Sequence, residues 1–393
     1  MDIKALYELY KSHSVVTTDS RDCPEGSIFI ALKGASFNGN KFAAAALEKG
    51  CSYAIIDEPE YAKADVPRII LVDDCLLTFK QLAREHRRQF NIPVIGITGT
   101  NGKTTTKELL SAVLAEKYNV MHTEGNFNND VGVPKTLLRL TPEHQIAVVE
   151  MGASHVGDIT KLVEYAEPTC GLITNVGRAH LQGFGSFEGV KRTKGELYDF
   201  LKANNALTFL NTSNDDLVEM ARQSELERII SYGQDAQANV QGRVVNADPF
   251  LRIEWTADEL TFKAQPTDVC SDNTDEHTEG TMLQVQSHLI GTYNLDNILA
   301  AVTVGLHFGV TPAQICHALE NYVPSNNRSQ LTTTADNRLI VDAYNANPTS
   351  MAAAINNFTH MGVAQPKMVI LGDMRELGDV SDEEHQKIVD SLK

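Results

Sequence analysis

A short glycine-containing segment carries the clearest chemical signal in the chain. Residues 95–105 read Ile-Gly-Ile-Thr-Gly-Thr-Asn-Gly-Lys-Thr-Thr, an apolar run followed by a turn and a helix-forming stretch. Glycines at such a turn let backbone N–H groups face phosphate oxygens, and a helix N-terminus favours negative charge. Lys103 can reach the β- and γ-phosphates of a nucleotide, and the Thr104 hydroxyl can bind Mg²⁺. The residues that we expect to bind ATP here are Gly99, Thr100, Asn101, Gly102, Lys103, Thr104 and Thr105.

The spacing of this segment departs from the general phosphate-loop pattern. Ile97 occupies the position five before Gly102, where that pattern has glycine, so the match is to the shorter Gly-Thr-Asn-Gly-Lys-Thr. The alternative is a glycine turn that merely precedes an ordinary helix. The lysine after a buried strand favours the phosphate loop over that alternative.

Other side chains could complete a site for phosphates and a metal. Glu150 ends the apolar run 146–150, where a carboxylate is costly unless it is paired or bound to a cation. It is therefore a natural Mg²⁺ ligand. His180 and Lys194 lie further along the chain. Taken alone, this histidine is typical of a loop residue and this lysine of a solvated helix.

The elements that must position these residues follow an alternating pattern. Apolar runs at 94–98, 146–150 and 171–175 are separated by helix-forming stretches, including one at 103–116. Such alternation predicts an α/β fold with a central parallel sheet and helices on both faces. Ligands bind beyond the carboxyl ends of such strands, so the loops after Thr98, Glu150 and Asn175 should converge on one site.

Three domains are expected from the chain length and from Pro-containing joints. They are a small N-terminal α/β domain at residues 1–90, a central ATP-binding domain at 91–324 and a Rossmann-like C-terminal domain at 325–393. The first has apolar runs of strand type at 27–32 and 53–56.

Later segments of the chain carry further expectations. Antiparallel strands are predicted at 251–255 and 260–263, and the acidic stretch 267–280 is predicted to be an exposed hairpin loop. The last domain should contain a strand at 339–342, a helix at 350–358 and a strand at 368–371. That is only part of a doubly wound domain, so we expect the C-terminal domain to be truncated.

The charge balance excludes several classes of partner. Lys and Arg total 34 against 51 Asp and Glu, a net charge of −17, which argues against nucleic acid and membrane surfaces. The six cysteines are scattered, as in a reducing compartment, and no run of apolar residues is long enough to span a membrane. We expect a cytoplasmic monomer without a membrane span.

Taken together, these residues resemble the Mur ligase family of peptidoglycan synthesis over essentially the whole chain. Residues 98–105 match the phosphate loop of that family. Further segments resemble the members that add D-alanyl-D-alanine to UDP-N-acetylmuramoyl-tripeptide. These segments are residues 18–21 (TDSR), 125–134 (GNFNNDVGVP), 150–154 (EMGAS), 344–348 (YNANP) and 371–378 (LGDMRELG).

The resemblance implies roles for residues around the nucleotide. The implied catalytic residues are Lys103, Glu150, His180 and Lys194, with Lys194 carbamylated. Carbamylation would turn its ammonium into an anion, so that Thr104, Glu150, His180 and Lys194 could bind two Mg²⁺ ions. Asn294 and Asn297 resemble the adenine-contacting segment, in which Tyr293 replaces the more usual histidine. Arg328 and Asp342 resemble residues that close on the nucleotide.

The resemblance also implies which residues bind the UDP-linked peptide and which lie on the D-Ala-D-Ala side. The residues implied to hold the UDP end are Ser20, Arg21, Lys33, Gly34 and Asn38. Those implied to line the tripeptide path are Asn126, Asn128 and Asn129. Those implied on the D-Ala-D-Ala side are Tyr344, Asn345 and Asn347.

The expected reaction is ATP-dependent amide formation through an acyl phosphate. One alternative is another ligase of the superfamily, either a diaminopimelate- or lysine-adding Mur enzyme or a folylpolyglutamate synthase. The other is a nucleotide-binding module or switch without ligase chemistry.

Overall fold

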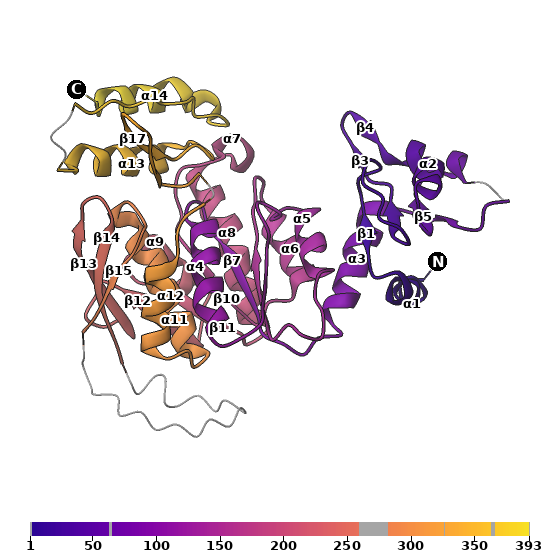
Figure 1. Ribbon diagram of the computed structural model, residues 1–393, viewed down its shortest axis with the longest axis horizontal. Helices are drawn as coiled ribbons and strands as arrows, with labels where there is room; N and C mark the ends of the chain where they lie inside the picture. Colours follow the sequence, from indigo (N-terminus) through magenta and orange to yellow (C-terminus); the bar gives the residue numbers. More distant parts are fainter. Residues whose placement is uncertain (1, 63–64, 259–281, 326, 363–365, 393) are drawn as a thin grey trace. The chain divides into compact units, whose positions relative to one another are not determined.

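A computed structural model describes residues 2–62, 65–258, 282–325, 327–362 and 366–392 (Figure 1). The chain divides into two units. The first comprises Met1–Ile92, Glu124–Pro142 and Glu164–Glu167. The second comprises Pro93–Thr123, Glu143–Val163 and Pro168–Lys393. The chain therefore passes from the second unit back into the first unit twice, at residues 124–142 and 164–167.

The first unit is built on a four-stranded parallel sheet in the order β1-β2-β5-β6. Its strands are β1 (Val16–Thr17), β2 (Ile28–Ile30), β5 (Tyr53–Ile56) and β6 (Ile69–Leu71), with a separate hairpin of β3 (Lys33–Gly34) and β4 (Phe37–Asn38). Its helices are α1 (Ile3–His13), α2 (Ala43–Glu48), α3 (Cys75–Arg87) and α5 (Gly132–Leu137). The strands predicted at 27–32 and 53–56 are confirmed as β2 and β5.

The second unit contains a nine-stranded sheet in the order β15-β14-β13-β12-β11-β10-β7-β9-β8. The strands are β7 (Val94–Thr98), β8 (Val120–His122), β9 (Ile146–Glu150), β10 (Cys170–Ile173), β11 (Leu207–Asn211), β12 (Ile229–Gly233), β13 (Val240–Ala247), β14 (Leu251–Ala257) and β15 (Leu283–Gln286). Pairing is parallel from β8 to β13 and antiparallel beyond. The predicted α/β class with a central parallel sheet is confirmed.

Helices cover both faces of this sheet, which explains why its central strands are apolar throughout. The helices are α4 (Lys103–Ala115), α6 (Asp158–Ala166), α7 (Leu181–Phe184), α8 (Phe187–Ala203), α9 (Asp215–Gln223), α11 (Leu295–His307) and α12 (Pro312–Asn321). Cys170 and Leu172 of β10 share a core cluster with residues of α4, α11 and α12. Gly171 lies between them and faces Leu197 and Leu201 of α8, on the opposite side of the sheet.

The C-terminal part of the second unit has less regular structure. It contains β16 (Gln330–Thr333) paired antiparallel with β17 (Arg338–Val341), then α13 (Pro348–His360) and α14 (Ser381–Asp390). The strand predicted at 368–371 is wrong, because this stretch is irregular and Met368 and Ile370 are 77% and 88% exposed. An apolar run becomes a strand only where a neighbour pairs with it, and none does so in the described residues.

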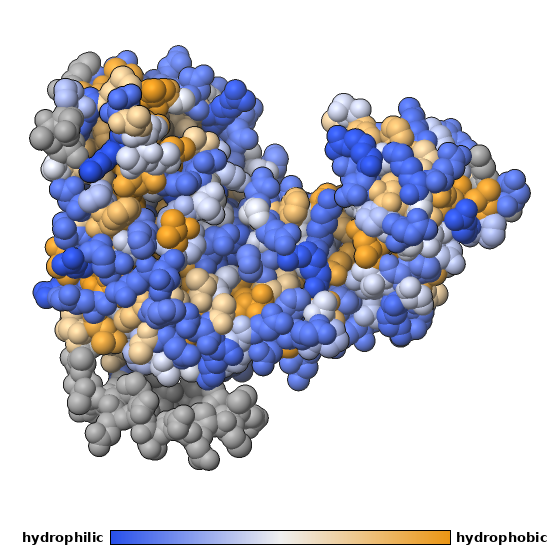
Figure 2. Space-filling view, in the orientation of Figure 1, coloured by the Kyte–Doolittle hydropathy of each residue, from blue (hydrophilic) through white to orange (hydrophobic). Residues whose placement is uncertain are grey.

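Two predictions lie outside the described residues: the strand at 260–263 and the hairpin loop at 267–280. Within the described parts of the chain, no helix has both the length and the apolar character needed to cross a membrane. Hydrophilic residues predominate on the face of the molecule shown in Figure 2, in keeping with the net charge of −17.

A buried lysine ties the helix after the phosphate loop to the sheet. Lys107 of α4 is fully buried, and its Nζ donates to the Thr123 carbonyl at 2.6 Å and lies 2.8 Å from the Glu108 carboxylate. Replacing this amine by an apolar group of similar length would leave both acceptors without this partner. Unsatisfied buried polar groups are costly, so the contact is a stabilising link between α4 and the end of β8.

We predict that Lys107→Met lowers the free energy of unfolding of the second unit by about 1–3 kcal/mol. The single tryptophan, Trp255, is buried in β14 and reports this unit in urea titrations followed by fluorescence. Lys161→Met, at a half-exposed lysine of α6, is the control and should stay within about 0.5 kcal/mol of the wild type. Equal midpoints for the two variants would contradict the role of Lys107.

Candidate functional site

The phosphate loop lies between the carboxyl end of β7 and the start of α4, as predicted. Gly99 and Gly102 have φ values of 146° and 79°, which L side chains rarely adopt. A Cβ atom at Gly99 would lie 2.0 Å from Thr174 Oγ1, and one at Gly102 would lie 2.6 Å from Asn297 Oδ1. Both glycines are therefore required by conformation and by close approach of neighbouring elements.

The loop after β10 holds the phosphate loop through a set of hydrogen bonds. The Asn175 carbonyl accepts from the Thr100 N–H at 2.9 Å, and Asn175 Oδ1 accepts from the Asn101 N–H at 3.0 Å. Asn175 Nδ2 and Thr174 Oγ1 both donate to the Asn101 carbonyl. The predicted convergence of these loops is confirmed. Asn175 was not predicted as a site residue; its place at the end of the apolar run 171–175 was its one signal in the sequence.

Lys103 and Thr104 face the interior of the same site. Lys103 Nζ donates to the carbonyls of Gly99 and Thr100, each at 2.9 Å. Burial lowers the pKa of Lys103, and the nearby Glu150 carboxylate opposes that shift. Thr104 Oγ1 donates to Glu150 Oε1 at 3.2 Å. The lysine, the hydroxyl and the carboxylate are thus gathered at one place, as a site for a phosphate and a cation requires.

Glu150 and Lys194 are buried charged groups beside the loop. Glu150 is 1% exposed at the end of β9, and Lys194 is 2% exposed on α8. Burial and, as a smaller effect, the positive charge of Lys103 together lower the pKa of Lys194 to about 7. Lys194 Nζ lies over the Phe184 ring, 5.4 Å from its centroid. Near neutral pH a large fraction of Lys194 is therefore an uncharged amine.

His180 is engaged by the C-terminal part of the chain. Its backbone is left-handed, with φ of 51°, and its Nδ1 lies in a close contact with the Glu376 carboxylate of the segment 371–378. Among the described residues, no group of three or more His, Cys, Asp or Glu side chains is arranged to hold a metal ion. The structure therefore joins Thr104 to Glu150 and joins His180 to Glu376.

Asn294 and Asn297 pack under the phosphate loop at the start of α11. Asn297 Nδ2 donates to Asn294 Oδ1 at 2.8 Å, and Asn297 Oδ1 accepts from Thr106 Oγ1 at 3.0 Å. Asn294 Nδ2 donates to the Ile290 carbonyl at 2.8 Å. In this structure their amides bind protein groups and connect α11 to α4.

Residues of the C-terminal part meet the phosphate loop through side-chain amides. Asn347 Nδ2 donates to Asn101 Oδ1 at 2.7 Å, and Asn101 Nδ2 donates back to Asn347 Oδ1 at 3.4 Å. The Arg328 guanidinium stacks on the Tyr344 ring at 3.8 Å from the centroid. The exposed Asn345 accepts from the Ala346 N–H. Of the three residues predicted on the D-Ala-D-Ala side, Asn347 reaches the phosphate loop.

The hydroxyl groups of Tyr293 and Ser329 connect Asp342 to the segment before α11. Ser329 Oγ donates to Asp342 Oδ2 at 3.4 Å and lies 2.6 Å from the Tyr293 hydroxyl. Tyr293 precedes Asn294, so these contacts join the segment before α11 to the β16–β17 hairpin. The residue that departs from the family pattern at position 293 therefore has a defined contact.

In the first unit, the residues predicted to hold the UDP end are engaged with neighbours. Arg21 binds the Asp19 carboxylate through two side-chain nitrogens. Lys33 Nζ lies 3.1 Å from Asp57 and 3.4 Å from Glu58. The contacts of the other three also lie within this unit. Asn38 Nδ2 donates to Glu58 at 2.7 Å, the Ser20 carbonyl accepts from Lys49, and Gly34 pairs with Phe37 in the β3–β4 hairpin.

The asparagine-rich loop belongs to the first unit and not to the sheet that precedes it. Asn129 Oδ1 accepts from the N–H groups of Val131 and Gly132 at 3.2 and 2.9 Å, so this side chain shapes the start of α5. The Asn126 carbonyl accepts from the Asn128 N–H. Asn126 and Asn128 therefore lie on the turn, whereas Asn129 is structural.

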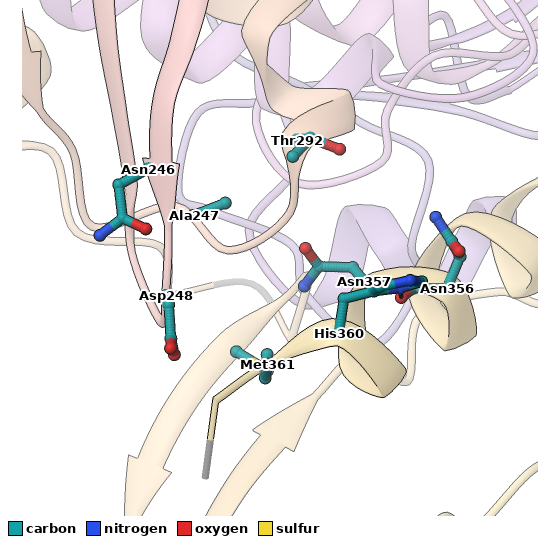
Figure 3. A pocket seen from close by; sticks show the side chains of 8 residues that line it. All are labelled: Asn246, Ala247, Asp248, Thr292, Asn356, Asn357, His360 and Met361. Atoms are coloured by element: carbon teal, nitrogen blue, oxygen red, sulfur yellow. Dashed lines mark hydrogen bonds between the residues drawn. The ribbon is translucent and has the colours of Figure 1, made fainter.

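A separate polar hollow of about 320 Å³ opens between the β13–β14 turn and α13 (Figure 3). Asn246, Asp248 and Thr292 line it together with Asn357, whose amide extends toward it from α13. None of the residues predicted for the site lines it. It is distinct from the phosphate loop.

Comparisons with known proteins agree on a single family. Residues 97–305 match the Mur ligase middle domain, 327–393 the Mur ligase glutamate ligase domain and 13–87 the Mur ligase family catalytic domain. The UDP-N-acetylmuramoyl-tripeptide–D-alanyl-D-alanine ligases of Bacillus subtilis and Escherichia coli are 33% and 35% identical. The matches cover 97% and 96% of this chain and 78% of each relative.

Two solved structures of MurF enzymes are similar to this chain over nearly its whole length. A crystal structure of MurF from Acinetobacter baumannii superimposes with a TM-score of 0.83 and 31% identity, over 97% of this chain and 81% of that chain. The MurF ligase from Thermotoga maritima in complex with ADP superimposes with a TM-score of 0.82 and 28% identity, over 96% of this chain and 82% of that chain.

We predict that Gly102→Ala weakens ATP binding at least roughly tenfold, because the added Cβ collides with the Asn297 amide and moves the loop. Isothermal titration calorimetry with ATP measures the effect. Gly26→Ala is the matched control, since Gly26 has the same φ of 79° with no atom within 4 Å of the added Cβ. Equal ATP affinity in the two variants would refute the steric argument.

Proposed function

The chain belongs to the Mur ligase family, and we propose that it adds D-alanyl-D-alanine to UDP-N-acetylmuramoyl-tripeptide in an ATP-dependent step of peptidoglycan precursor synthesis. The proposed setting is the cytoplasm, where ATP and the UDP-linked precursor are available. The single observation that carries the proposal is the assembly at the phosphate loop of Lys103, Thr104, Glu150 and Lys194. Full-length relatives that catalyse this reaction support the choice of substrates.

The oxygen atoms gathered at the loop fit magnesium. The Thr104 hydroxyl and the Glu150 carboxylate are hydrogen-bonded to each other, and hard oxygen ligands are those that Mg²⁺ prefers. Mg²⁺ is commonly held by one or two carboxylates together with substrate phosphates and water. We propose Thr104 for one ion and Glu150 with His180 for a second, with carbamylated Lys194 as a further ligand. Bound magnesium would neutralise charge on the phosphates.

The proposed reaction proceeds in two substitutions. The terminal carboxylate of the tripeptide attacks the γ-phosphate of ATP, so that ADP leaves and an acyl phosphate forms. The amine of D-Ala-D-Ala then attacks the acyl carbon, and inorganic phosphate leaves. A free carboxylate is a poor acyl donor, which is why ATP is needed. The protein contributes chiefly by orienting reactants and neutralising charge.

Named side chains have distinct tasks in this scheme. Lys103 would exchange its two loop carbonyls for phosphate oxygens of ATP. Asn175 would keep the loop backbone in place meanwhile. Asn347 contacts the phosphate loop through Asn101 and lies in the segment proposed for the dipeptide, so it would bring the amine substrate toward the γ-phosphate. Arg328, stacked on Tyr344, would add positive charge nearby.

A screen of amine substrates tests the proposal directly. The purified protein is supplied with ATP, Mg²⁺ and UDP-N-acetylmuramoyl-tripeptide, and phosphate release is measured with D-Ala-D-Ala, diaminopimelate, lysine or glutamate. We expect release only with D-Ala-D-Ala. Release with one of the other amines alone would favour another ligase of the superfamily. Slow ATP turnover that no UDP-muramoyl peptide changes would favour a nucleotide-binding module.

We predict that Lys194→Ala loses ligase activity by at least about 100-fold and that acetate or formate partly restores it, because a small carboxylate can replace the carbamate. Lys191→Ala is the control on the same helix, since Lys191 is paired with Glu188 and Asp216. The lysine carbamate should also give a ¹³C signal with labelled bicarbonate. Because only the neutral amine reacts and the pKa is about 7, that signal should grow from about pH 6 to about pH 8. If the Lys194→Ala variant kept its activity, Lys194 would have no role in the reaction.

A further inference from the structure

Lys135, in the first unit, lies over an aromatic ring and has no carboxylate partner among the described residues. In the segment 124–139, the acidic residues are each bound to another cation: Asp130 lies 2.9 Å from Lys80, and Glu124 lies 2.7 Å from Arg139. Among the described residues, no carboxylate lies within ion-pair distance of Lys135 Nζ. Its contact is the ring of Phe127, 5.6 Å from the centroid. In a chain with 51 acidic and 34 basic residues, such a half-buried lysine is conspicuous.

The loop that presents this pair is firmly anchored. Lys80 is buried on α3, and besides Asp130 it lies over the Tyr165 ring at 5.6 Å. Asn129 fixes the start of α5, and Lys135 lies in the last turn of this short helix. A Cβ atom at Gly132 would lie 2.3 Å from the Phe127 backbone, so α5 and the turn are packed against each other. Phe127 and Lys135 therefore have defined positions, although Phe127 is 43% exposed.

This pair lies beside the residues proposed for the tripeptide path, because Phe127 stands between Asn126 and Asn128 in the chain. Arg21 lowers the pKa of Asp19 through hydrogen bonds, and the charge of Lys135 adds a smaller lowering. The neighbourhood combines an exposed aromatic ring, an ammonium held over it and the amides of Asn126 and Asn128. Rings of this kind hold ammonium groups in place by a cation–π interaction.

We propose that Lys135, positioned over Phe127, binds an anionic group of the UDP-peptide substrate and contributes to recognition of that substrate. The anion is either a phosphate of the diphosphate or a carboxylate of the peptide, since both suit an ammonium. This inference rests on the proposed function for the identity of the substrate. The carboxylates of Asp130 and Glu124 do not compete for Lys135, because Lys80 and Arg139 hold them. The Asp19 carboxylate, whose pKa Lys135 also lowers, is held by Arg21. The ammonium is therefore available to a ligand.

Binding measurements test this without requiring turnover. We predict that Lys135→Met weakens binding of UDP-N-acetylmuramoyl-tripeptide at least roughly tenfold by calorimetry, while ATP affinity is unchanged. Lys135→Arg retains the charge and should bind within about twofold of the wild type. Lys11→Met is the matched control, because Lys11 also lies over an aromatic ring, Tyr7 at 5.9 Å, but is paired with Glu8. It should bind like the wild type.

A second ligand separates the two sources of the anion. UDP carries the diphosphate without the peptide, so an equal loss of UDP and tripeptide binding in Lys135→Met assigns the contact to a phosphate. Loss confined to the tripeptide assigns it to a peptide carboxylate. Unchanged binding of both ligands would overturn the proposal. A failed amine screen with intact UDP-ligand binding would instead count against the proposed function alone.

Discussion

The hydrogen bonds between the phosphate loop and the loop after β10 are the constraint on which the site depends. Gly99 and Gly102 give the phosphate loop a backbone with positive φ values. The side-chain amide and the carbonyl of Asn175 form hydrogen bonds with N–H and C=O groups of this loop. This is possible because β10, β7 and β9 are neighbours and parallel, so that their carboxyl ends meet. Glu150 reaches Thr104 for the same reason.

Buried charge is the second feature that distinguishes this region. Glu150, Lys107 and Lys194 are almost completely enclosed, and each such group costs free energy unless a partner compensates it. Lys107 meets that requirement with a carbonyl and a carboxylate and is structural. Lys194, whose pKa is lowered to about 7, is instead the lysine that we propose is carbamylated. Two equally buried lysines therefore differ, because Lys107 has a carbonyl and a carboxylate as partners and Lys194 feels the positive charge of Lys103.

The residues proposed to bind the UDP-linked substrate all belong to the first unit. The chain returns to this unit after the phosphate-loop helix and β8, and the returning segment carries the asparagine-rich turn. Ion pairs hold this segment: Glu124 at its start binds Arg139 near its end, and Asp130 between them binds Lys80 of α3. The arrangement leaves Lys135 over Phe127, which is the basis of the proposed anion contact.

Local sequence by itself determined β7, the phosphate loop and the importance of Glu150, because apolar runs, glycines and a lysine after a strand report on their own backbone. It did not predict the contacts of Asn175 or Glu376, since these join segments far apart in the chain. Nor did it predict Lys135 over Phe127, which depends on how the turn packs against α5. The strand expected at 368–371 is absent for a related reason: an apolar run shows strand propensity, but pairing requires a neighbour. Tertiary structure alone decided which asparagines bind the phosphate loop and which lysines are buried, because these partners and this burial arise only when distant elements pack together.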